Sequence, residues 1–176
     1  MRRPPTDPVN ALLSLGYTLL LNQVMASASL VGFDPYFGML HFVDYGRPSL
    51  ALDLMEEWRP IIVDTLVLSV FNLKALAPSD FEERPRTEEA KNGEAESEKG
   101  PQTSDEGEEK EKTAVLLTES GFRKFITQYE RKMTQKAQHH LTGDQITYRD
   151  CIREQVRHFA RCIKGEESEY QPMPLR

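Results

Sequence analysis

Residues 7–32 read DPVNALLSLGYTLLLNQVMASASLVG, and this stretch decides the fold class of the chain. Asp7 can accept the free amide protons at a helix start, and Pro8 suits the first helical position because it has no amide proton to leave unpaired. Small and apolar residues then recur at helical spacing as far as Gly32, which suits a helix end. We therefore expect a long buried helix here, the first element of a mainly helical fold.

Two further helices are expected before residue 77. Ser49 can cap a helix that runs to Trp58, and Pro60 should end or kink it because proline lacks an amide proton. Residues 61–76 are apolar on most faces, a pattern typical of a central core helix. The first half of the chain therefore predicts helices that pack on one another.

Between the helical halves lies a segment of different composition. Residues 78–112 carry 13 acidic and 6 basic side chains, whereas the whole chain has a net charge of −6. Residues 84–112 contain almost nothing large and apolar, so we expect this acidic insertion to be disordered. Residues 114–117 form a short strand pattern that could pair with the stretch around Phe81, which places the insertion at a hairpin tip.

Two more helices should follow the insertion. Thr118 or Ser120 can open the first helix. Thr147 opens the second with a capping-box-like pattern, and Gly165 ends that helix. The predicted fold is thus a mainly α helical bundle with a short β-hairpin that carries a disordered insertion. Its parts are residues 1–83, the insertion 84–112, and residues 113–176.

The cysteines and the apolar stretches bear on where the protein is located in the cell. Cys151 and Cys162 are eleven residues apart in one helical pattern, about 16 Å, which is too far for a disulfide. Free thiols and the lack of a visible signal peptide favour a reducing cytoplasm. The apolar stretches 12–31 and 61–73 are interrupted or short, so we expect no membrane span.

One cluster of residue types has the chemistry of a metal site. Asp53 and Glu56 are three apart, hence on one face of a helix, and His41 follows a turn that could bring it close. One imidazole and two carboxylates suit magnesium or manganese. The same spacing also occurs on ordinary solvated helix surface. Asp53 lies among apolar residues, however, and a carboxylate in such a setting needs a partner.

A second cluster is a stripe of arginines on the last helix. Four arginines spaced by four residues could face a phosphate backbone, and the alternative is a solvated face of an amphipathic helix. The histidines nearby show no spacing with carboxylates or thiols that suggests a metal, so we expect them at the surface. The arginines are Arg149, Arg153, Arg157 and Arg161, and the histidines are His139, His140 and His158.

Several long motifs resemble one known family. They read RRPPxDPVNALLSxGY at 2–17, GFDPYxGxLH at 32–41 and GRPSLALDLMEExRP at 46–60, and Tyr129-Glu130-Arg131-Lys132, Tyr148-Arg149 and Tyr170-x-Pro172 continue the pattern. Together they resemble the C-terminal helical domain of the CRISPR-associated integrase and endonuclease of the Cas-one family. The likeness spans residues 2–83 and 113–176.

This resemblance implies a catalytic site of His41, Asp53 and Glu56. It implies that His41 and Glu56 bind a divalent metal, Mg²⁺ or Mn²⁺, with Asp53 as a further acidic ligand or support. Family members cut and join DNA during spacer acquisition, the adaptation stage of antiviral defence. They act as homodimers, usually with the small Cas-two protein, so the resemblance also favours DNA contacts by the four arginines.

The chain departs from the family pattern in two ways. Family members carry a β-rich N-terminal domain and a further metal-binding glutamate just upstream of the arginine-proline motif, and this chain begins after both. The alternative is therefore a truncated, catalytically incomplete helical module that binds DNA or a partner. The acidic insertion has no counterpart in the family pattern, and we interpret it as a solvated spacer or a weak decoy for the basic face.

Overall fold

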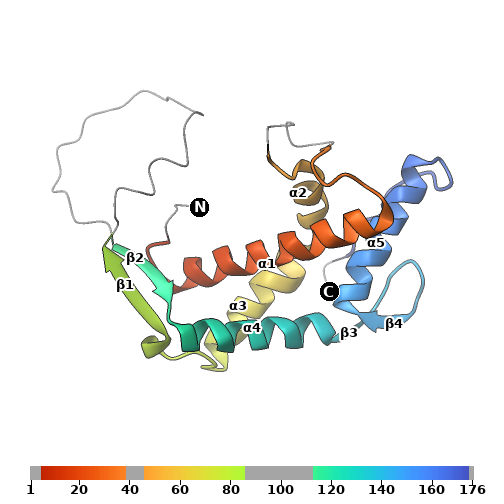
Figure 1. Ribbon diagram of the computed structural model, residues 1–176. Coiled ribbons are helices and arrows are strands. Elements are labelled where there is room, and N and C mark those ends of the chain that lie inside the picture. The colour runs from red at the N-terminus through yellow and green to blue at the C-terminus, as the bar shows by residue number, and fades with distance from the viewer. Residues whose placement is uncertain (1–4, 39–45, 86–112, 175–176) are drawn as a thin grey trace, which may run out of the picture.

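The computed structural model of the protein describes residues 5–38, 46–85 and 113–174 (Figure 1). Helices dominate, and two short hairpins lie beside them. The predicted class, a mainly helical fold with a short hairpin, is confirmed. The elements are α1 Pro8–Val31, α2 Ser49–Met55, η1 Arg59–Asp64, α3 Thr65–Asn72, η2 Pro78–Asp80, β1 Phe81–Pro85, β2 Thr113–Leu117, α4 Glu119–Thr134, β3 Lys136–Gln138, β4 Gln145–Thr147 and α5 Tyr148–Ile163.

The long helix α1 forms as the sequence predicts. The Asp7 side chain accepts the Asn10 amide at 2.9 Å, and Gly32 ends the helix with a φ of 99°, a conformation that favours glycine. In Figure 1 α1 crosses the middle of the molecule, with α3 and α4 below it and α5 at its far end. Leu12, Leu20 and Val24 are fully buried, so α1 is the central helix of the core.

By length and composition α1 is also apolar enough to cross a membrane, and it is the one helix among the described residues with this property. A core helix has the same composition. Here α1 packs against α2, η1 and α5, so the fold itself accounts for its apolar character.

The helix that starts at Ser49 ends before Pro60, as predicted, but already at Met55 and not at Trp58. Residues 59–64 form a π-helix, η1, which continues directly into α3. Proline cannot donate an amide hydrogen bond, and Pro60 lies in the first turn of η1, where no donor is needed. The predicted core helix over residues 61–76 is therefore two elements. The second, α3, ends at Asn72, and Lys74 two residues later takes a positive φ of 51°.

The predicted hairpin is present, and its strands are β1 and β2. Phe81 lies opposite Leu117 and Pro85 opposite Thr113 in an antiparallel register. The strand β1 thus extends two residues into the predicted insertion, and residues 86–112 lie outside the described part of the chain. On the other edge of β2, the Val115 amide donates to the Pro5 carbonyl at 2.9 Å.

The C-terminal part contains a hairpin that the sequence reasoning missed. β3 and β4 pair between α4 and α5. Helix α4 begins with Thr118 as its cap, and α5 begins with Thr147, whose hydroxyl accepts the Asp150 amide at 3.1 Å. Both caps agree with the sequence. Cys151 and Cys162 are unbridged, also as predicted.

Candidate metal centre

The two acidic residues expected to bind metal lie at the end of α2. Asp53 is half-buried in the last turn of the helix, and Glu56 is exposed directly after it. Both line a cavity of about 430 Å³, so the structure brings these carboxylates together. The other residues around the cavity are Leu50, Leu54, Glu57, Phe159, Tyr170 and Pro172.

His41, the third expected site residue, belongs to residues 39–45 and lies outside the described part of the chain. The turn that precedes it is fixed to α2, because the Pro35 carbonyl accepts the amides of Leu50 and Ala51 at 3.0 and 3.3 Å. These bonds satisfy the free amides of the helix start. Ser49 is thus the first helical residue and not the cap that the sequence suggested.

Glu56 has a cationic neighbour. Its carboxylate pairs with Arg59 at 2.9 Å, and the Arg59 guanidinium lies 5.2 Å from the centre of the Tyr17 ring. The Tyr17 hydroxyl in turn donates to Asp64 at 2.6 Å, and burial together with this bond raises the pKa of Tyr17 to about 12. A ligand that binds Glu56 must therefore compete with Arg59 for the carboxylate.

Glu57, a residue that the sequence analysis did not single out, is half-buried in the structure. Its carboxylate accepts hydrogen bonds from the Tyr170 hydroxyl at 2.6 Å, the Met173 amide at 2.7 Å and the Gln155 side chain at 3.3 Å. Burial raises the pKa of Glu57, although these hydrogen bonds act in the opposite direction. The adjacent glutamates thus differ in environment: Glu56 is exposed, whereas the Glu57 carboxylate is bonded to residues within the chain.

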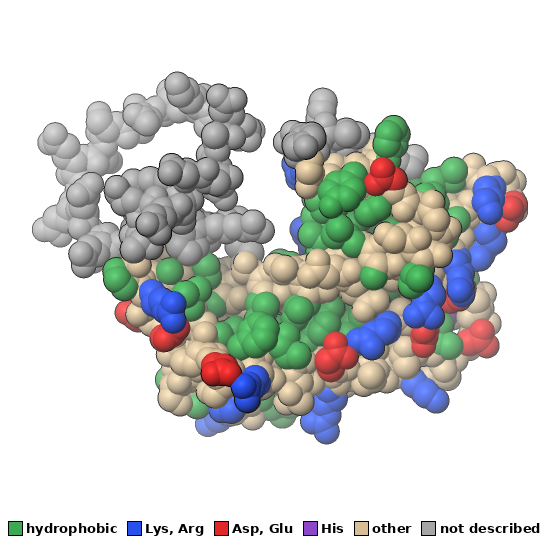
Figure 2. Space-filling view, in the orientation of Figure 1, with side chains coloured by type: hydrophobic (Ala, Val, Ile, Leu, Met, Phe, Trp, Pro, Cys, Tyr) green, Lys and Arg blue, Asp and Glu red, His purple; other side chains and the backbone are tan. Residues whose placement is uncertain are grey.

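The arginines of α5 all have carboxylate partners. Arg149 pairs with Glu130 at 2.7 Å and Arg153 with Asp150 at 3.3 Å. Arg157 pairs with Glu154, and Arg161 with Glu167. Figure 2 shows Lys and Arg side chains interspersed with Asp and Glu along this side of the molecule. The four arginines thus lie along one helix as the sequence predicts, but carboxylates of the same chain partly neutralise their charge.

Comparison with known proteins identifies the family. Residues 1–92, which hold α1, α2 and the segment of His41, match the family model described as CRISPR associated protein Cas1. The chain belongs to the Cas1 family. A CRISPR-associated endonuclease Cas1 of Thermus thermophilus is 37% identical over 175 residues, which are 99% of this chain and 45% of that protein.

Other relatives of this Cas1 chain include a fusion protein and several solved structures. A Cas4 exonuclease and Cas1 endonuclease fusion of Geobacter sulfurreducens is 36% identical over 96% of this chain and 25% of the fusion. Among solved structures, a casposase bound to its integration product superposes with a TM-score of 0.75 at 25% identity, over 97% of this chain and 40% of that one. The Cas1 protein of Thermotoga maritima gives 0.69 at 23% identity over 94% and 43% of the two chains. This Cas1 chain thus spans less than half of each of these four proteins.

The prediction that the three C-terminal histidines lie at the surface is wrong. His139 and His158 are each only 1% exposed, and His140 is half-buried. Burial lowers the pKa of His139. The chain after α5 folds back onto His140 and His158, where Gln171 contacts both rings, and no local spacing could have revealed this.

Among the described residues, His158, Cys162 and Glu167 form one group of metal-ligand types, with ligand atoms within 4.8 Å of one another. The Gln171 amide donates to His158 Nε2 at 2.9 Å, so the proton of the neutral ring lies on Nδ1, which faces Glu167. A metal at Nδ1 would move this proton to Nε2, against the amide. Burial also raises the pKa of the Cys162 thiol. In this Cas1 chain the group is a hydrogen-bonded cluster that holds the C-terminal residues.

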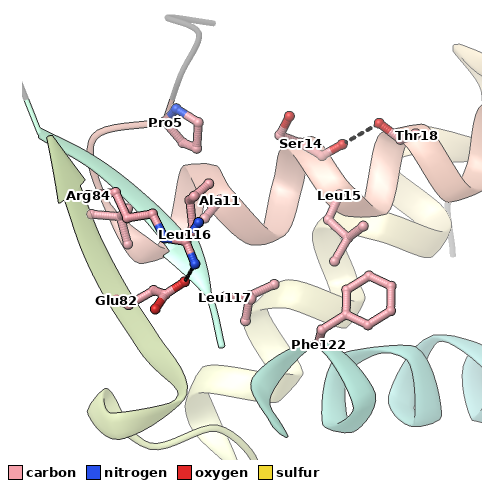
Figure 3. Close-up of a pocket in the computed structure, with 11 residues that line it drawn as sticks. Pro5, Ala11, Ser14, Leu15, Thr18, Glu82, Arg84, Leu116, Leu117 and Phe122 are labelled. Atoms are coloured by element: carbon pink, nitrogen blue, oxygen red, sulfur yellow. Dashed lines mark hydrogen bonds and ion pairs between the residues drawn. The ribbon is translucent and has the colours of Figure 1, made fainter. Parts of the chain in front are cut away.

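A second cavity, of about 420 Å³, lies between α1, the first hairpin and α4 (Figure 3). Leu15 of α1, Leu117 of β2 and Phe122 of α4 point into it, and the charged pair Glu82–Arg84 lies at its rim. Figure 2 shows hydrophobic side chains gathered between α1 and α4. Because its one carboxylate is paired with an arginine at 2.7 Å, this cavity offers no second metal centre.

Proposed function

We propose that this Cas1 chain forms the metal-binding part of a DNA endonuclease and integrase that acts in CRISPR spacer acquisition. His41 and Glu56 would bind Mg²⁺ or Mn²⁺, and Asp53 would be a further ligand or support. The observation that carries this proposal is the shared cavity of Asp53 and Glu56 beside the turn that leads to His41. Relatives that match nearly the whole of this chain bear the name endonuclease.

The residue types fit such an ion. Carboxylate oxygens and an imidazole nitrogen are suitable ligands for Mg²⁺ and Mn²⁺. A bound ion would lower the pKa of an attacking water or hydroxyl and neutralise charge at the phosphate. The protein itself supplies orientation: Arg59 holds the Glu56 carboxylate at the cavity, and the bonds from α2 to Pro35 fix the start of the His41 segment.

We extend the proposal to DNA binding by Arg149, Arg153, Arg157 and Arg161. Because each arginine already pairs with a carboxylate, phosphates must replace these partners, and the net gain per contact is smaller than for an unpaired arginine. We also propose a homodimer, a Cas2 partner and a cytoplasmic location. Structures of Cas6-RT-Cas1–Cas2 complexes share this fold, and the free cysteines agree with a reducing compartment.

Manganese titration of the chain by calorimetry tests the metal site. We expect micromolar binding by the wild type and at least a tenfold loss in His41→Ala and Glu56→Gln. Glu119→Gln is a matched control, because Glu119 is also an exposed glutamate paired with an arginine on its own helix. Equal affinity in all four proteins would overturn the proposal.

A cleavage and joining assay separates the proposal from its alternative, a non-catalytic module that binds DNA or a partner. The chain is incubated with labelled duplex DNA in Mn²⁺ or in chelator, and both products and binding are measured. Metal-dependent products that disappear in Glu56→Gln support catalysis. Binding that is equal with and without metal, with no products, supports the alternative.

A further inference from the structure

The residues after α5 return to the candidate metal centre. We name residues 168–174 the C-terminal tail. Gln171 is held from both sides of its backbone: its amide donates to His158 at 2.9 Å, and its carbonyl accepts from Gln155 at 2.9 Å and from His140 at 3.2 Å. Two further tail residues, Tyr170 and Pro172, line the same cavity as Asp53 and Glu56. The tail is therefore a built wall of the site and not a loose end.

The tail connects to the acidic segment through Glu57. This carboxylate accepts the Tyr170 hydroxyl at 2.6 Å and the Met173 amide at 2.7 Å, and these two donors are 113 and 116 residues away in sequence. The Tyr170 ring is itself fixed, because it stacks on His158 with centroids 5.2 Å apart and meets the Phe159 ring edge-on at 5.6 Å. The Tyr170 hydroxyl thus donates from a rigid platform on α5.

The segment that carries Glu56 needs such support. It lies between the end of α2 at Met55 and the start of η1 at Arg59, where the regular helical bonds are interrupted. The Glu56 amide makes a long bond of 3.4 Å to the Asp53 carbonyl. Successive residues of a helical turn point about 100° apart, so the inward direction of the Glu57 side chain determines the outward direction of Glu56.

We propose that Tyr170 is a positioning residue of the metal centre, which acts through Glu57 to fix the turn that carries Glu56. The inference rests on the proposed function, since it concerns the same site. It adds a residue outside the ligand set and explains why the tail docks against α2. Partners that orient metal ligands from behind commonly change metal affinity by about tenfold or more when they are removed.

The chain provides a close control for Tyr170→Phe. Tyr129 is also buried, at 4% exposure, and its hydroxyl has no hydrogen-bond partner among the described residues. Tyr129→Phe therefore removes the same atom from a buried ring without removing a bond to the site. A purely structural role of Tyr170 would lower stability without changing metal affinity at temperatures where both variants are folded.

The first experiment is manganese titration of the wild type, Tyr170→Phe and Tyr129→Phe, well below their melting temperatures. We expect about tenfold weaker binding in Tyr170→Phe and wild-type affinity in Tyr129→Phe. If Glu56→Gln loses metal but Tyr170→Phe does not, the positioning role is overturned and the proposed function stands. If Glu56→Gln binds as the wild type does, the proposed function fails, and this role fails with it.

A second experiment measures the same coupling without metal. Hydrogen exchange of the amides of residues 56–58 should be faster in Tyr170→Phe than in the wild type, and unchanged in Tyr129→Phe. Exchange in α4 should be equal in the wild type and Tyr170→Phe. Unchanged exchange at residues 56–58 in Tyr170→Phe would overturn the mechanical connection between the tail and the Glu56 turn, whatever the metal affinity.

Discussion

Two carboxylates, half-buried Glu57 beside the metal centre and buried Asp80 at the hairpin end, have pKa values shifted in opposite directions. Glu57 accepts bonds only from uncharged donors, and burial raises its pKa. Asp80 is 2% exposed, yet its pKa is lowered, chiefly because Lys124 donates to both of its oxygens at 2.8 Å. The direction of each pKa shift follows its largest cause, which is burial at Glu57 and the hydrogen bonds from Lys124 at Asp80.

The two carboxylates also connect different elements of the fold. Glu57 joins the end of α2 to the C-terminal tail, whereas Asp80 joins η2 to the first turn of α4. The Asp80 carboxylate accepts the Ala77 amide at 2.8 Å and the Ser120 hydroxyl at 3.1 Å, and its backbone carbonyl accepts the Thr118 amide at 2.9 Å. Removing either carboxylate should therefore loosen one specific junction.

The largest effect is expected for Glu57→Ala. The change leaves the Tyr170 hydroxyl, the Met173 amide and the Gln155 side chain without their acceptor, so it should lower the free energy of unfolding by about 3 kcal/mol. Urea unfolding measures this loss. Glu56→Ala is the control, because it removes the same type of side chain from the preceding, exposed residue. It should change the free energy of unfolding by less than about 0.5 kcal/mol. Equal losses would contradict the buried acceptor role.

Gly121→Ala tests the closeness of the Asp80 junction. A Cβ at Gly121 would lie 2.3 Å from the Asp80 carbonyl oxygen, so α4 or η2 must shift, at a cost of about 2 kcal/mol. Alanine otherwise stabilises a helix relative to glycine by about 1 kcal/mol. The sign of the change in unfolding free energy therefore shows whether the clash or the helix propensity is larger. Stabilisation would show that the junction is looser than described.

Asp80→Asn should have a smaller effect that depends on pH, because asparagine keeps the shape and one acceptor. The native pKa of Asp80 lies below its ordinary value of 3.8, so its ionised form stabilises the fold above that pH. This contribution is lost as the pH falls through the lowered native pKa. Thermal unfolding should therefore show a lower melting temperature for the variant at neutral pH and convergence with the wild type in strong acid. A gap independent of pH would exclude the charge as its cause.

The smallest effect is expected for Arg123→Ala, one residue before Lys124. Arg123 pairs with Glu119 at 2.5 Å, but the two side chains are 76% and 80% exposed. Water screens such a pair, so its loss should cost about 0.3 kcal/mol by urea unfolding. A cost equal to that of Asp80→Asn at neutral pH would show that burial does not distinguish these two ion pairs.

Local signals in the sequence predicted much of this fold. Asp7, Thr118 and Thr147 are caps whose side chains bond amides three residues ahead, and this chemistry is visible in sequence alone. The hairpin of β1 and β2 was also predictable from its apolar strand. The β3–β4 hairpin was not, since each strand has three residues and little apolar pattern.

The candidate site was only partly predictable. Asp53 and Glu56 were found from their spacing and the family motifs, and they do share a cavity. The role of Glu57 and the burial of His158 were missed because both depend on the C-terminal tail, which folds back from far along the chain. Helical spacing describes neighbours on one element and carries no information on such contacts.

The buried residue after Glu57 gives the junction an optical signature. Trp58 is the sole tryptophan of the sequence, and it is 1% exposed in the turn that the tail supports. Excitation of this indole therefore reports one place in the molecule, without labels. Release of the tail would let water reach the ring and shift its emission to longer wavelength, so fluorescence could follow docking at the metal centre in real time.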